Sequence, residues 1–134
     1  MKRNDLPTLA AASLAGALVA FALPPWGWWP LALIGVALFV RIMATSVSSS
    51  PRARFVLGFA FDASWFAPGM GWMWFLPAPG YVIAVVLFSA FHGFASILGA
   101  RAQFPIVGLV LAHTLAETLR MSFPFGGVPL ASLA

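Results

Sequence analysis

Cysteine is absent from the sequence, lysine occurs once, and there are three acidic residues among 134. Without cysteine the chain has no disulfide, no thiolate metal site and no cysteine nucleophile. Charged residues make up 7% of the sequence, whereas soluble domains carry about 25%. With 62% hydrophobic residues and a mean hydropathy of +0.98, the composition excludes an ordinary soluble domain and predicts an all-α integral membrane protein.

The apolar runs predict a single transmembrane domain, residues 1–134, built as a bundle of about five helices. A crossing needs about 20 apolar residues, so the chain has room for roughly five crossings and no soluble domain. The predicted spans are residues 6–23, 28–44, 55–73, 81–98 and 105–120. Residues 45–54 form the one clearly polar loop, and Pro68, Gly69 and Gly71 are expected to kink or unwind the third span.

Small residues recur at every fourth position of the first and fifth spans: Ala12, Gly16 and Ala20, then Gly108, Ala112 and Ala116. Because close backbone contact replaces the hydrophobic driving force inside lipid, these positions predict helix-packing faces. Residues 24–30 form an uncharged turn with three tryptophans, which favour the headgroup level.

The basic residues predict orientation better than they predict a ligand. The net charge is +4 and the pI about 11.3, but the cations are scattered between apolar blocks and form no patch for nucleic acid. Cytoplasmic loops are enriched in lysine and arginine. A cytoplasmic N-terminus leaves only Arg120 outside and puts the other basic residues inside: Lys2, Arg3, Arg41, Arg52, Arg54 and Arg101.

The first apolar run has a second interpretation, as a signal peptide. Lys2-Arg3 precedes it, and Ala20-Phe21-Ala22 imitates a cleavage site, but the run is longer than the usual 7–15 residues. Cleavage would leave the later loops on the same sides, so orientation does not decide between the two.

The third and fourth predicted spans carry polar groups well inside the membrane, away from the ends of the span. An ionised carboxylate such as Asp62 costs about 2.5–3.5 kcal/mol at mid-membrane, so it marks either a proton or substrate site or a structural acid with a partner. His92 shares a helix face with Ser89 and Ser96, which either binds a polar ligand or bonds a neighbouring helix.

His113, Glu117 and Arg120 form a polar stripe on the fifth span, at offsets of four and three. We predict no metal site there, because two such groups fall short of the three or four that zinc needs. A general base would need a reacting group nearby, which the sequence does not offer. Either Glu117 and Arg120 pair internally and order the next loop, or they face a substrate.

The helix cannot continue through Phe123-Pro124-Phe125 and the glycines that follow, which predict a surface loop.

Several of these segments together resemble the membrane portion of bacterial apolipoprotein N-acyltransferases. They are residues 21–32 (FALPPWGWWPLA), residues 58–61 (GFAF), and Glu117-Thr118-Leu119-Arg120 followed by Phe123-Pro124-Phe125. The chain departs from that pattern at Thr118 and Phe125, where the family often has tryptophan, and at Asp62, in a span usually without an acid. The resemblance implies a multi-pass protein of the bacterial cytoplasmic (inner) membrane.

The resemblance also implies acyl transfer from a membrane phospholipid to the N-terminal diacylglyceryl-cysteine of a lipoprotein, without a cofactor. In that family a nitrilase-like domain carries a catalytic Glu-Lys-Cys set, and none of it maps onto this sequence. We therefore expect a fragment or separate subunit that is inactive alone and works with such a domain in cis or in trans. Its substrate- or domain-docking residues would be Glu117, Arg120, Phe123, Pro124 and Phe125.

The alternative hypothesis comes from another class of protein. A small, non-enzymatic transporter or channel subunit would use Asp62, His92 and His113 as a proton or ion path. Reading the DNA beyond codon 134 would separate the two, because the first hypothesis expects more helices and a Glu-Lys-Cys domain downstream.

Overall fold

The computed structural model describes residues 6–45, 50–75 and 78–123, and within these ranges all regular structure is helical. Five α-helices follow one another: α1 (Leu6–Phe21), α2 (Pro30–Thr45), α3 (Pro51–Gly69), α4 (Ala78–Gly99) and α5 (Pro105–Ser122). A 3₁₀-helix, η2 (Gly71–Phe75), lies between α3 and α4. The prediction of an all-α bundle of five helices is therefore confirmed.

The helix ends follow local chemistry. Ser50 caps α3 by accepting a hydrogen bond from the Ala53 N–H at 3.2 Å, and Pro51 occupies the first turn, where its missing N–H costs nothing. The third helix consequently begins at Pro51, four residues before the predicted span, and the polar loop predicted for residues 45–54 was too long. Its other end comes four residues before the predicted end at residue 73, because α3 stops at Gly69 and gives way to the tighter η2, in agreement with the unwinding expected at Pro68, Gly69 and Gly71.

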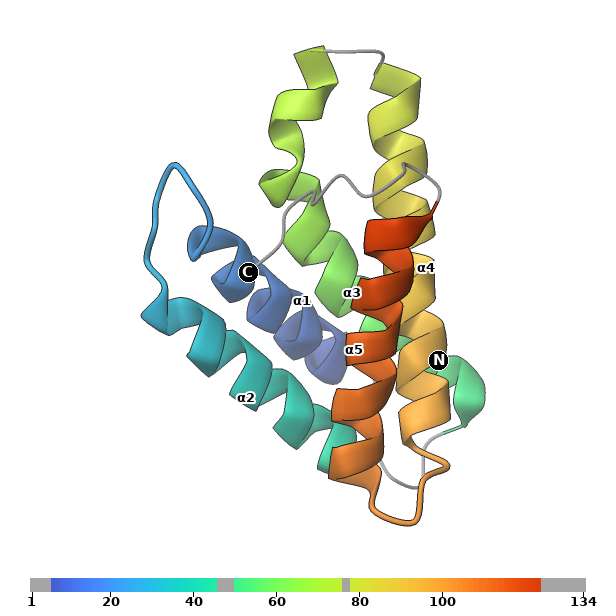
Figure 1. Ribbon diagram of the computed structural model, residues 1–134. Helices are drawn as coiled ribbons and strands as arrows, with labels where there is room; N and C mark the ends of the chain where they lie inside the picture. Colours follow the sequence, from blue (N-terminus) through green and yellow to red (C-terminus); the bar gives the residue numbers. More distant parts are fainter. Residues whose placement is uncertain (1–5, 46–49, 76–77, 124–134) are drawn as a thin grey trace.

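The helices pack in the spatial order α2, α1, α3, α4, α5, and α5 returns to touch α2 over a short stretch. Figure 1 shows α2 and α5 converging at their lower ends and diverging upward. The turn after α1, the 3₁₀-helix η2 and the C-terminal end of α5 all lie toward the upper side of this view. Two polar faces, on α4 and α5, point into the bundle.

Close backbone contact explains the predicted packing face on α1. Ala12, Gly16 and Ala20 are all buried, and a Cβ atom on Gly16 would lie only 1.8 Å from the Phe61 carbonyl oxygen of α3. Only glycine fits there. On α5, Gly108 meets the backbone of Gly99, so the small residues of this helix also mark a packing face.

The outer surface is strongly apolar. Leucine, isoleucine, valine and phenylalanine side chains on α2, α4 and α5 are exposed, among them Leu33 at 65% and Leu111 at 64%. The tryptophans of the turn after α1 and of η2 are also exposed: Trp26, Trp28, Trp29, Trp72 and Trp74. Large apolar surfaces bordered by tryptophan are what a helix bundle presents to lipid and its interfaces.

The five helices differ more in length than the five predicted spans do. By length and composition, α4 is the one described helix that clearly qualifies to cross a membrane. The apolar helices α1 and α2 have 16 residues each, about 24 Å, less than the roughly 30 Å hydrocarbon core. The number of crossings and the cytoplasmic N-terminus therefore stay predictions.

Candidate functional site

Polar side chains from three helices meet inside the bundle, and His92 of α4 connects them. Its Nδ1 lies 3.6 Å from Asp62 Oδ1 of α3, and its Nε2 lies 3.0 Å from Glu117 Oε1 of α5, although the ring is poorly aligned for a straight hydrogen bond. Asp62 is 0% and His92 1% exposed. The sequence identified both residues, but not that they are neighbours.

Glu117 and Arg120 form an internal ion pair, one of the two alternatives that the sequence left open. Arg120 Nε donates to Glu117 Oε1 at 3.1 Å, and Nη2 donates to Oε2, so the contact is bidentate. The Arg120 side chain is buried, with its guanidinium carbon 5.0 Å from the ring centre of Phe66 and 5.4 Å from that of Phe88. Planar, bidentate pairing and stacking on aromatic rings suit arginine rather than lysine.

His113 joins the cluster from one turn earlier on α5. Its Nδ1 lies 3.0 Å from the Leu109 carbonyl oxygen, which can only accept, so Nδ1 carries the proton. Its Nε2 lies 3.5 Å from Ser96 Oγ, and the ring centres of His113 and His92 are 5.3 Å apart. The two polar faces predicted separately on the fourth and fifth spans are thus parts of one site.

Asp62, like His92, has no hydrogen bond from its side chain in the described part of the chain. Within the described part of the chain, neither of its carboxylate oxygens has a hydrogen-bond partner. The pair with His92 is its nearest charged contact, and 3.6 Å is too long for a hydrogen bond. Buried polar groups are nearly always partnered, so this carboxylate points to a missing proton, ion or ligand.

A cavity of about 230 Å³ borders the cluster. Its wall is mostly apolar, and His92, His113 and Glu117 give it a polar end. The lining comes from four helices: Val36, Phe39, Val40, Phe61, Trp65, His92, Leu109, Val110, His113, Thr114 and Glu117. Val36 of α2 and Val110 of α5 are themselves exposed, so this side pocket faces the outside between those two helices.

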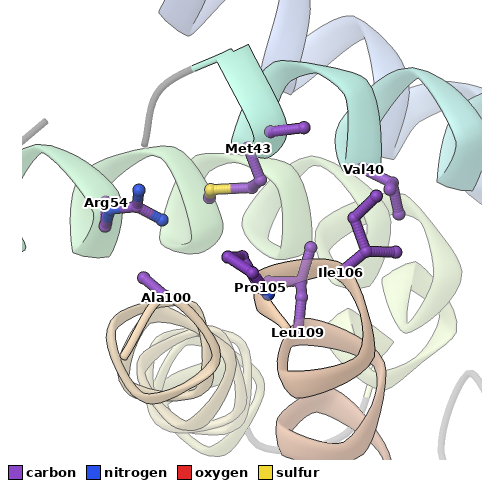
Figure 2. A pocket seen from close by; sticks show the side chains of 8 residues that line it. Val40, Met43, Arg54, Ala100, Pro105, Ile106 and Leu109 are labelled. Atoms are coloured by element: carbon purple, nitrogen blue, oxygen red, sulfur yellow. The ribbon is translucent and has the colours of Figure 1, made fainter. Parts of the chain in front are cut away.

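A second cavity, of about 10 Å³, is no larger than a single water position. Figure 2 shows it between Met43, Ala100, Pro105 and Leu109, with Arg54 at one edge. The sequence placed Arg54 in a polar loop, but it belongs to α3 and is 5% exposed. The Ser50-Pro51 start signal would have predicted its place in the helix.

The remaining docking candidates lie at or beyond the end of α5. Phe123 follows the helix and is 64% exposed. Pro124 and Phe125 lie outside the described residues. The sequence did not single out Ser96 as a neighbour of His113, or Phe39 as the ring that contacts it, because both contacts join helices far apart in the chain.

Comparisons with known proteins add to this geometry. Residues 15–134 match a family described as the apolipoprotein N-acyltransferase N-terminal domain. An apolipoprotein N-acyltransferase of Ralstonia nicotianae (strain ATCC BAA-1114 / GMI1000) is 33% identical over 98 residues, covering 66% of this chain and 18% of that protein. One of Rhodopseudomonas palustris (strain ATCC BAA-98 / CGA009) is 30% identical over 127 residues, covering 81% of this chain and 24% of that protein. The chain thus spans less than a quarter of either relative, and no solved structure matches it.

Proposed function

We propose that this chain, which belongs to the apolipoprotein N-acyltransferase N-terminal domain family, is the lipid-holding membrane domain of such an enzyme. The complete enzyme would transfer an acyl chain from a phospholipid to the N-terminal diacylglyceryl-cysteine of a lipoprotein. A nitrilase-like domain, in cis or in trans, would supply the catalytic Glu-Lys-Cys set. The site of action would be the bacterial cytoplasmic membrane, with the chain crossing it several times.

The side pocket is the observation that carries this proposal. Apolar cavities of about 150 Å³ can accept a benzene-sized ligand, so about 230 Å³ can accept several methylene groups of an acyl chain. Its place between the exposed faces of α2 and α5 allows a lipid tail to enter sideways from the bilayer. An acyl chain there would replace lipid contacts with contacts to Phe39, Phe61 and Trp65.

The polar end of the pocket suits the other part of a lipid. Trp65 Nε1 is buried without a hydrogen-bond partner in the described part of the chain, and an ester carbonyl could accept a hydrogen bond from it. Glu117 is 25% exposed, whereas its partner Arg120 is buried. The pair would therefore hold the end of α5 rigid while presenting one carboxylate edge toward the pocket.

We expect this chain alone to transfer no acyl group. Acyl transfer through a cysteine needs a thiolate, a base and an oxyanion site, and the chain has no cysteine and a single lysine at Lys2. Its part would be to bind the acyl donor and, with Glu117, Arg120 and the segment from Phe123 to Phe125, to dock the catalytic domain. Acyl transfer to a lipoprotein peptide by vesicles containing only this chain would contradict the proposal.

Lipid occupancy can be tested by photocrosslinking. A phospholipid with a diazirine in its acyl chain, reconstituted with the chain in vesicles, is expected to label residues that line the side pocket. Val110→Trp should fill the pocket mouth and reduce labelling there several-fold. Val107→Trp is the matched control, because Val107 is similarly exposed on α5 but does not line the pocket. Equal labelling in the two variants would show that lipid does not enter this pocket.

One observation supports the transporter alternative. The residues of its predicted path, Asp62, His92 and His113, lie in one cluster. That hypothesis requires ion or proton flux into vesicles that Asp62→Asn abolishes. The acyltransferase hypothesis expects no flux in either protein. The two assays use the same vesicles, so one preparation discriminates between the two functions.

A further inference from the structure

Three potential metal ligands, one from each of α3, α4 and α5, converge inside the bundle. One ligand atom each from Asp62, His92 and His113 lies within 4.8 Å of the other two. Asp62 and His92 are fully buried, and both Asp62 oxygens lack a hydrogen-bond partner in the described part of the chain. Burial of an unsatisfied carboxylate beside two imidazoles is costly unless it takes up a proton or a cation binds between these groups.

Both histidines are oriented as metal-binding histidines usually are. Such rings donate the N–H that does not face the metal to a carboxylate or a backbone carbonyl. Here His92 Nε2 lies 3.0 Å from Glu117, and His113 Nδ1 donates to the Leu109 carbonyl at 3.0 Å. His113 Nε2 therefore keeps its lone pair, and its competing contact, with Ser96 Oγ, is at the 3.5 Å limit. His92 Nδ1 keeps its lone pair when the ring proton is on Nε2, on the side of Glu117, although this contact is too poorly aligned to be a hydrogen bond.

The charges of the cluster favour a cation. Metal ligands bind as carboxylate and neutral imidazole, and in that state Asp62 and Glu117 contribute two negative charges against the one positive charge of Arg120, an excess of one negative charge in the cluster. A divalent cation with one anionic ligand, such as hydroxide, balances it. Two imidazoles and one carboxylate suit Zn²⁺, Fe²⁺, Co²⁺ or Mn²⁺ and leave a coordination position open. That position would face the side pocket, which His92 and His113 line.

We propose that Asp62, His92 and His113 form a binding site for a divalent transition-metal ion. Tetrahedral ligands about 2.0–2.1 Å from zinc lie about 3.3 Å from one another, and Asp62 Oδ1 and His92 Nδ1 are already 3.6 Å apart. Binding must shorten the widest separation, 4.8 Å at most, by up to about 1.5 Å. This inference rests on the cluster alone and is independent of the proposed acyl-transfer function.

The test is a metal titration of the complete 134-residue chain, purified in detergent and stripped with a chelator. Co²⁺ is added first, because its visible absorption reports coordination number and nitrogen ligation, and Zn²⁺ is then used to displace it. We expect one equivalent of Co²⁺ in a four- or five-coordinate site, displaced by one equivalent of Zn²⁺. A folded wild-type chain that binds no Co²⁺ or Zn²⁺ overturns the proposal, whatever the variants do.

Variants locate the site. Asp62→Asn and His113→Gln should each weaken binding by at least about tenfold, and Glu117→Gln, which acts through His92, should weaken it by about 10–100-fold without abolishing it. Ser89→Ala is the control, because Ser89 is equally buried, one turn from His92, and outside the ligand set. Circular dichroism and gel filtration verify that each variant folds. Metal binding that survives in folded Asp62→Asn and His113→Gln overturns the proposal.

Discussion

Removing the positive charge of Arg120 while leaving Glu117 in place should be among the most damaging changes to this bundle. Arg120→Met keeps an unbranched, apolar side chain of similar length but withdraws both hydrogen bonds from the Glu117 carboxylate. It also removes the cation that lies over the Phe66 and Phe88 rings. The carboxylate then keeps His92 as its remaining observed partner.

The expected loss of unfolding free energy in Arg120→Met follows from the burial of the ion pair. Breaking a buried ion pair by deleting one partner typically costs about 3–5 kcal/mol, because the other charge stays desolvated. Arg120 is 2% exposed, but the Glu117 side chain that would be left without it is 25% exposed, so water offsets part of this cost and we expect a loss near the lower end, about 3 kcal/mol. Replacing both members, as Glu117→Gln with Arg120→Met, leaves no charge behind and should cost much less than the sum of the two single changes. We expect an interaction energy of about 1–3 kcal/mol from this double-mutant cycle.

The assay is reversible unfolding in mixed detergent–SDS micelles, followed by circular dichroism, on wild type, both single variants and the double variant. Arg101→Met is the control, because Arg101 is exposed and its replacement should change the free energy of unfolding by no more than about 0.5 kcal/mol. If Arg120→Met is as stable as Arg101→Met, or if the double variant equals the sum of the singles, the pair is not the buried, coupled element described above.

Three further predictions concern packing and helix ends, each measured in the same unfolding assay. Gly16→Val should destabilise the bundle by about 1–3 kcal/mol, since a Cβ would strike the Phe61 backbone, whereas Gly71→Ala, with open space around it, should be nearly neutral. Phe39→Leu should cost about 0.5–1.5 kcal/mol by ending its stacking on Phe61, whose ring centre is 4.1 Å away; an unchanged free energy of unfolding would contradict this. Ser50→Ala should cost about 1 kcal/mol and Ser50→Asp almost nothing, because only the second keeps a capping oxygen.

Much of the fold could be predicted because it depends on patterns local in sequence. The apolar runs located five helices, with ends between zero and four residues from those observed. The repeat at Ala12, Gly16 and Ala20 predicted a buried packing face because every fourth residue lies on the same side of a helix. The largest errors, of four residues, are at the two ends of the third helix: hydropathy outweighed the capping signal at Ser50 and Pro51, and it extended the span past Gly69.

Less of the site could be predicted, because its contacts join helices that hydropathy cannot place side by side. The offsets within the fifth span were sufficient for the Glu117–Arg120 pair, since both residues lie on one helix. No offset predicts that His92 lies between Asp62 and Glu117, because this depends on which faces α3, α4 and α5 turn toward one another. The side pocket has the same origin, since its wall comes from four helices.

The cost of burying charge gives one physical reason for both the predicted Glu117–Arg120 pair and the unpredicted cluster around His92. Each ionisable group of a lipid-facing bundle must find its partner inside the protein, because the bilayer offers none. His92 lies 3.0 Å from Glu117, and Glu117 and Arg120 meet this requirement with each other. Asp62 does not, since both its oxygens lack hydrogen bonds in the described part of the chain. A buried carboxyl group without a hydrogen-bond partner points to a bound proton or ligand, and the imidazole nitrogens of His92 and His113 beside Asp62 are the reason to seek a cation there.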